Sequence, residues 1–139
     1  MLTITPSMNI SAHQQLKLLN DLRRAVERNE LVLHYQPKFA APDYRMAGVE
    51  ALLRWTDPEF GAVSPGVFIP LAEESGYIVT LGAWVMEQAV REAALWMHSG
   101  SPIMISVNVS ALESRQPAFV ERMTRLLAVH QLPPNLLEL

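Results

Sequence analysis

Two charged side chains, Glu50 and Arg54, lie within the otherwise apolar stretch Val49–Trp55. A strand over Met46–Trp55 would carry both on one face and leave the other face apolar, because side chains alternate along a strand. Their Cα atoms would be about 13 Å apart, too far for an ordinary ion pair unless Arg54 bends back. Each charge is therefore expected to have a partner elsewhere: another strand, a metal ion or a substrate phosphate. A half-exposed strand with two solvated charges would show the same pattern.

Two further predicted strands carry polar groups on one face in the same way. The first covers Leu31–Phe39 and the second covers Pro102–Ser110, and in both the opposite face is apolar. Turn residues at Ala41–Tyr44 predict that the first strand forms a hairpin with the Glu50 strand. The polar residues are His34, Gln36 and Lys38 on the first strand, and Ser106 and Asn108 on the second.

Helices are predicted between the later strands, which favours crossover connections and a parallel sheet. The apolar faces would take the helices, so the polar faces would converge inside a (β/α) barrel, where sites gather at the carboxyl ends of strands. Gln36, Glu50, Arg54 and Asn108 fall at such ends. Four helices are predicted. The first follows Ser11, which is expected to form a capping box with Gln14, and the others run from Ser64-Pro65 to Gly76, from Ile78 to Gly100 and over Pro117–His130. Met1–Ile10 is interpreted as a leader, Asp57–Gly61 as a loop, and Leu136–Leu139 as the start of another strand.

The residue types on these faces favour metal-assisted phosphoester chemistry. A carboxylate and an amide oxygen, as in Glu50 and Asn108, are hard oxygen donors suited to Mg²⁺ or Mn²⁺. An arginine near them suits a phosphate. The sequence contains no Gly-x-Ser-x-Gly elbow, no Gly-rich phosphate loop and no His-Glu-x-x-His motif.

Composition bounds the remaining possibilities. The 139 residues are one domain or part of one, and only 18% are charged against a usual quarter or so, which hints that something outside this chain covers apolar surface. The net charge of −3 lacks the excess of positive charge that is typical of proteins that bind a nucleic acid polymer. The absence of cysteine excludes disulfides and thiol catalysis. No membrane segment or signal peptide is predicted, so a cytoplasmic protein is expected.

Four short sequence blocks surround these polar positions. They are Tyr35-Gln36-Pro37, Glu50-Ala51-Leu52 with its extension through Trp55, Phe68-Ile69-Pro70-Leu71-Ala72-Glu73 and Val107-Asn108-Val109-Ser110. In order and spacing these blocks resemble the EAL domain family of cyclic di-GMP phosphodiesterases, whose signature is the Glu50-Ala51-Leu52 triplet. The match runs from about Leu16 to Leu139.

The resemblance implies an α/β fold, a TIM-like (β/α) barrel whose first strand is antiparallel to the others. It also implies metal-dependent hydrolysis of cyclic di-GMP to the linear dinucleotide, with Mg²⁺ or Mn²⁺ as the metal. By the same resemblance Glu50 and Asn108 would bind metal and Arg54 would contact phosphate. Gln36 and Leu52 would contact substrate.

The sequence departs from the family in two places. Ala111 is followed by Leu112 and Glu113 where the family often has Ala-Arg-Gln. The sequence also ends at Leu139, where the family continues with a metal-binding Glu, for which Glu138 is not expected to substitute. About half a barrel is therefore expected: residues 1–15 as a leader or linker end, and residues 16–139 as the N-terminal half of an EAL domain.

Half a barrel is expected to be inactive by itself, to bind metal weakly, and to self-associate or pair with a partner chain that covers its open half. Two donors are few for an ion that prefers about six. An alternative interpretation is a non-catalytic module that binds cyclic di-GMP or another protein.

Overall fold

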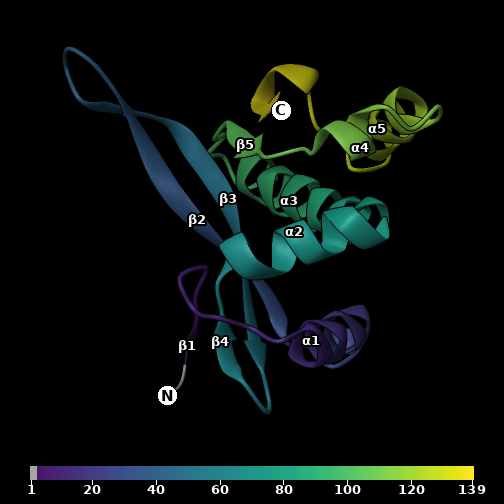
Figure 1. Cartoon of the computed structure of the whole chain (residues 1–139). Coiled ribbons are helices and arrows are strands. Elements are labelled where there is room, and N and C mark those ends of the chain that lie inside the picture. Colours follow the sequence, from purple (N-terminus) through teal and green to yellow (C-terminus); the bar gives the residue numbers. More distant parts are fainter. Residues whose placement is uncertain (1–2) are drawn as a thin grey trace. The chain divides into compact units, whose positions relative to one another are not determined.

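The computed structural model describes residues 3–139, which form two compact units (Figure 1). Unit 1 contains the described residues up to Val32 together with Leu53–Leu81; unit 2 contains Leu33–Leu52 and Gly82–Leu139. Strands β2 (Leu31–Ala40) and β3 (Arg45–Asp57) pair with each other, as the predicted hairpin requires, and both pass through the two units. Among residues 3–139 no helix is both long and apolar enough to cross a membrane.

Unit 1 is built on two capped helices. Helix α1 (Ala12–Ala25) begins at Ser11, and the predicted capping box with Gln14 is present. Helix α2 (Pro65–Ser75) begins at Ser64 and ends at Gly76, whose φ of 82° is a left-handed conformation that favours glycine. The rings of Trp55 and Phe68, both at most 2% exposed, meet edge to face at 5.6 Å in the core of this unit.

Two short strands of unit 1 were not predicted. Strand β4 (Gly61–Val63) pairs antiparallel with the end of β3, so the predicted loop is the tight turn of a second hairpin. Strand β1 (Thr3–Ile4) pairs in parallel with β4, so part of the expected leader belongs to a sheet. Strands of two and three residues are too short to show a period of alternation. The domain boundary after residue 15 stays a prediction.

Unit 2 has the predicted parallel strands under a helix. Strand β5 (Ile105–Val107) pairs in parallel with β3 and with β6 (Leu137–Glu138). Helix α3 (Ile78–His98) packs on the apolar face of these strands (Figure 1). The contacting residues from α3 within unit 2 include Met86, Ala89, Val90, Ala93 and Ala94, and those from the strands are Val49, Ala51, Ile105 and Val107.

The strand predicted over Pro102–Ser110 is shorter than expected, because pairing with β3 covers only Ile105–Val107. Ser110 instead caps a short helix that was not predicted, α4 (Ala111–Ser114). The remaining elements are α5 (Phe119–Val129), which confirms the predicted last helix, and the 3-10 turn η1 (Pro134–Leu136) before β6.

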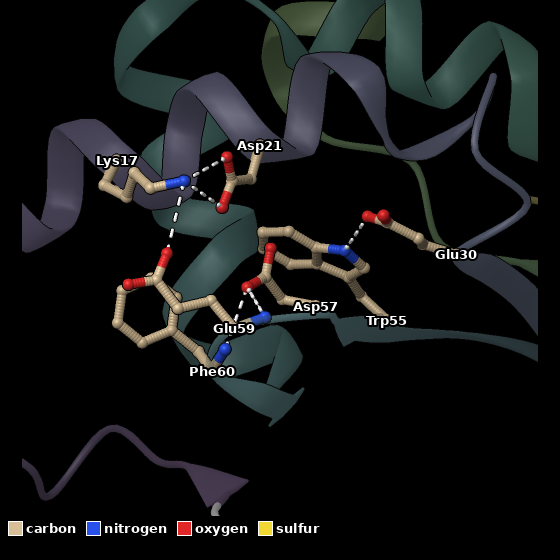
Figure 2. Close-up of polar contacts among 7 residues, drawn as sticks. All are labelled: Lys17, Asp21, Glu30, Trp55, Asp57, Glu59 and Phe60. Atoms are coloured by element: carbon tan, nitrogen blue, oxygen red, sulfur yellow. Dashed lines mark hydrogen bonds and ion pairs between the residues drawn. The ribbon is translucent and has the colours of Figure 1, made fainter.

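Two buried carboxyl groups, Asp21 of α1 and Asp57 at the end of β3, lie within unit 1 (Figure 2). Asp57 is 1% exposed, and its Oδ2 accepts hydrogen bonds from the backbone N–H groups of Glu59 and Phe60, both at 2.9 Å. Asp21 accepts a hydrogen bond from the Lys17 ammonium at 3.0 Å, and Lys17 also pairs with Glu59 at 3.3 Å. The carboxyl groups of Asp21 and Asp57 are close enough to influence each other's pKa.

The pKa values of the two carboxyl groups are shifted in opposite directions. Burial raises the pKa of Asp57, and its hydrogen bond to Asp21 adds to that rise against the backbone donors. Burial would also raise the pKa of Asp21, but the hydrogen bonds from Lys17 and Asp57 outweigh it and the pKa of Asp21 is lowered. The buried Oδ1 of Asp57 has no hydrogen-bond partner among the described residues, in keeping with a carboxyl group whose pKa is raised.

We predict that this pair makes the free energy of unfolding depend on pH. Because the pKa of Asp57 is raised above 3.8, its protonated form contributes stability that is complete below that value and is lost as pH rises through the folded-state pKa. Asp57→Asn keeps an acceptor for the two backbone amides and a donor toward Asp21, but does not titrate. The free energy of unfolding of Asp57→Asn should therefore not show this loss as pH rises. Asp57→Ala should cost about 1–3 kcal/mol at every pH.

Urea denaturation at a series of pH values measures the effect. The matched control is Glu27→Gln, an exposed carboxylate of the same unit, which should keep the wild-type profile. Parallel profiles for wild type and Asp57→Asn would contradict the prediction.

Candidate functional site

Glu50 and Asn108 come together in unit 2. Glu50 lies beside Ser106 in the parallel pairing of β3 and β5, and Asn108 follows directly after β5. The side-chain amide of Asn108 donates a hydrogen bond from Nδ2 to Oε2 of Glu50 at 3.0 Å. Glu50 is half-buried and Asn108 is exposed. The juxtaposition predicted from strand alternation is therefore present.

Strand alternation places this pair because the neighbouring residues are held in the core. Val49 and Ala51 on β3, and Ile105 and Val107 on β5, are at most 6% exposed against α3. Their burial forces the alternate residues, including Glu50, to the opposite face.

A glycine fixes the register of the two strands. The backbone N–H of Val49 donates to the carbonyl of Met104 at 2.9 Å. A Cβ at Gly48 would lie 2.6 Å from that carbonyl oxygen, so only glycine permits this approach. The close approach brings β3 beside β5 in the register that pairs Glu50 with Ser106.

The other predicted site residues are spread over the two units. Gln36 is exposed on β2, and Leu52 is half-buried on β3; both belong to unit 2. Arg54 belongs to unit 1, where its Nη1 donates to the carbonyl of Leu53 at 3.1 Å. Within residues 3–139 Arg54 makes no ion pair, in line with the distance argued from the sequence. Its role as a phosphate contact, and the roles of Gln36 and Leu52, stay predictions.

The donor set fits a hard divalent cation in part. The Glu50 carboxylate and the Asn108 amide oxygen are the ligand types that Mg²⁺ and Mn²⁺ take. No group of three or more His, Cys, Asp or Glu residues suited to a metal is found in residues 3–139. The described residues thus offer two neighbouring oxygen donors, and water or further protein groups would have to complete the usual six or so.

The sequence reasoning missed Glu113, which holds the segment after Asn108. Glu113 is 7% exposed, and its carboxylate accepts a hydrogen bond from the backbone N–H of Ser110 at 2.9 Å. The Ser110 hydroxyl accepts one from the backbone N–H of Glu113 at 3.2 Å. The spacing of Ser110 and Glu113 is that of a capping box, a signal visible in the sequence.

Helix α3 leaves room for this carboxylate at a glycine. A Cβ added to Gly82 would overlap the Glu113 carboxylate. The departure from the family at Leu112-Glu113 is therefore accommodated locally by a residue without a side chain on the facing helix.

The model of the family described as EAL domain matches residues 19–139. The bifunctional diguanylate cyclase/cyclic di-GMP phosphodiesterase MucR of Pseudomonas aeruginosa is 49% identical over 130 residues, which are 93% of this chain and 19% of that protein. The cyclic di-GMP phosphodiesterase PdeR of Escherichia coli is 45% identical over 107 residues, 77% of this chain and 16% of that protein. The chain thus spans less than a fifth of the length of each of these two curated relatives.

Solved structures show the same similarity. The PaMucR phosphodiesterase in complex with c-di-GMP has a TM-score of 0.82 and 48% identity, over 87% of this chain and 49% of that one. The EAL enzyme Bd1971 in its cGMP-bound form has a TM-score of 0.79 and 30% identity, over 91% of this chain and 36% of that one. The predicted fold class, a partial barrel of the EAL type, is confirmed.

We predict that the effect of Gly82→Ala on the free energy of unfolding depends on the residue at position 113: destabilising with glutamate there, and stabilising with alanine. In the wild-type background the new methyl group should displace the Glu113 carboxylate and destabilise the fold by about 1–3 kcal/mol. In a Glu113→Ala background the space is free, and alanine in a helix should stabilise by about 0.5–1 kcal/mol over glycine. Denaturation of the four proteins of this double-mutant cycle gives both values. An equal destabilisation in both backgrounds would refute the contact.

Proposed function

Because the chain belongs to the EAL domain family, we propose that it forms part of a cyclic di-GMP phosphodiesterase. The reaction is hydrolysis of one phosphodiester bond of cyclic di-GMP to the linear dinucleotide in bacterial signalling. The observation that carries the proposal is the contact between Glu50 and Asn108, two oxygen-donor residues brought from different strands to one place. The names of MucR and PdeR support the substrate.

The residues of this chain would bind the metal ion and orient the substrate. A divalent cation, Mg²⁺ or Mn²⁺, supplies Lewis-acid polarisation of a phosphate oxygen and a more acidic bound water. Glu50 and Asn108 would hold it on the polar face of β3 and β5. Arg54, with no carboxylate partner among the described residues, would contact a phosphate. Gln36 and Leu52 would contact the nucleotide.

We further propose that these 139 residues do not turn over substrate by themselves. Two protein donors in residues 3–139 are too few to hold a divalent cation tightly. The same scarcity favours the second candidate function, a module that binds cyclic di-GMP or a protein without catalysis. Self-association, or a partner that covers the open side of the partial barrel, belongs to this proposal as well.

Hydrolysis assays with Mg²⁺ and Mn²⁺ test the function. A complete EAL domain that carries this sequence should hydrolyse cyclic di-GMP, and the 139-residue chain should not. In the complete domain Glu50→Gln should lower kcat/KM at least about 100-fold, because a neutral amide is a weaker metal ligand than a carboxylate. Glu87→Gln, on the exposed part of α3, is the matched control. A complete domain that binds cyclic di-GMP without hydrolysis would support the second candidate.

Arg54 is expected to serve binding rather than stability. In the complete domain Arg54→Ala should weaken cyclic di-GMP binding by about tenfold or more, since a charge-assisted hydrogen bond contributes about 1.5–3 kcal/mol. The Tm should change little, because the one hydrogen-bond partner of the guanidinium within residues 3–139 is the adjacent Leu53 carbonyl. Equilibrium dialysis and thermal denaturation measure the two effects, with exposed Arg91→Ala as the control. Unchanged affinity, or a large fall in Tm, would refute this role.

A further inference from the structure

A second polar cluster lies in unit 2 beside the candidate metal ligands and is not used by them. It joins Lys38 of β2, Ser106 of β5 and Glu138 of β6. The Lys38 ammonium donates to the Ser106 hydroxyl at 2.7 Å and to Oε1 of Glu138 at 3.4 Å. The Ser106 hydroxyl in turn donates to Oε1 of Glu138 at 3.1 Å. All three hydrogen bonds can form at once, because the hydroxyl both accepts and donates.

Two residues of this cluster, Ser106 and Glu138, are aligned with Glu50 across the neighbouring strands β3, β5 and β6; we call these three aligned residues the Glu50 row. Glu50 is paired in register with Ser106, and Ser106 is paired in register with Glu138. Residues paired in this way on neighbouring strands project from the same face, and the strands are about 4.8 Å apart. Two carboxylates therefore flank Ser106 on one face. Asn108 contacts the first, and Lys38 contacts the second.

Both carboxylates of the row would attract a divalent cation if they were equally free. Lys38 makes the two carboxylates differ in their attraction for a cation, because its ammonium group has only hydrogen-bond donors and carries a positive charge. A cation at Oε1 of Glu138 would have to displace Lys38 or lie against a like charge. At Glu50 the neighbour is the Asn108 amide, which is uncharged and whose oxygen is of a type that can bind a metal ion.

We propose that Lys38 is a positioning residue that occupies Glu138 and thereby confines the divalent cation to Glu50 and Asn108. The inference rests on the proposed function for its metal, and it concerns how this chain selects one carboxylate of two. Stability is not an adequate account of the cluster. The side chains of Lys38 and Glu138 are 38% and 55% exposed, and an ion pair so exposed contributes at most about 1 kcal/mol.

The test counts bound Mn²⁺ in a complete EAL domain that carries this sequence, using the electron paramagnetic resonance signal of free Mn²⁺ during a titration. Lys38→Met keeps the length of the side chain without its charge, and should bind one Mn²⁺ more per domain than wild type. Lys38→Arg should restore the wild-type count. Lys38→Met/Glu138→Gln should also restore it, because the exposed carboxylate is gone.

Lys17→Met is the matched control, since Lys17 also pairs with carboxylates but belongs to unit 1. If Lys38→Met does not fold by circular dichroism, Lys38→Gln replaces it. An unchanged Mn²⁺ count in the folded variant would overturn the proposal, and so would an extra Mn²⁺ that persists with Glu138→Gln. Failure of the proposed function gives a different result: wild-type domain without hydrolysis, whatever the count in Lys38→Met.

Discussion

The pairing of β3 with β5 is the constraint on which the candidate site depends. The backbone of Gly48 approaches the carbonyl of Met104 more closely than any side chain would allow, and the adjacent Val49 amide bonds to that carbonyl. Once this register is set, alternation decides every side-chain direction along both strands. Val49 and Ile105 enter the core together, and Glu50 must share the other face with Ser106. A shift by one residue would bury the carboxylate against α3.

The small residues of α3 make that register compatible with close packing. Ala89 and Ala93 have no exposed surface, so the helix lies close to the sheet. Gly82, on the same helix, leaves space for Glu113, which caps the segment that follows Asn108. The helix therefore supports both strands of the site: it covers their apolar faces, and it admits the carboxylate that orders the loop after β5.

Charge on the polar face of β3, β5 and β6 is distributed unevenly. The Glu50 carboxylate accepts a hydrogen bond from the amide of Asn108, whereas the Glu138 carboxylate accepts hydrogen bonds from the Lys38 ammonium and the Ser106 hydroxyl. Unit 1 shows a different solution to the burial of acidic groups. There the carboxylate of Asp57 accepts hydrogen bonds from two backbone amides, and burial raises its pKa, whereas the hydrogen bond from Lys17 helps to lower the pKa of Asp21.

Much of the fold and the family were determined by local patterns in the sequence. The capping box at Ser11, the Ser64-Pro65 start and Gly76 stop of α2, and the alternation around Glu50 each depend on residues close in the chain, so they could be predicted. The contact between Glu50 and Asn108 followed from alternation together with parallel pairing. The metal and substrate roles of these residues rest on resemblance and stay predictions.

Only the tertiary structure decided which groups meet across distant segments. Strands β1 and β4 are too short to leave a periodic signal, and their pairing depends on neighbours supplied by the fold. The Asp21–Asp57 pair and the Lys38–Ser106–Glu138 cluster join residues far apart in the chain, and no local spacing announces them. The capping role of Glu113 was not predicted, and the space for its carboxylate at Gly82 comes from another helix. Local physics therefore specifies elements and faces, whereas register and packing specify which polar groups share a face at contact distance.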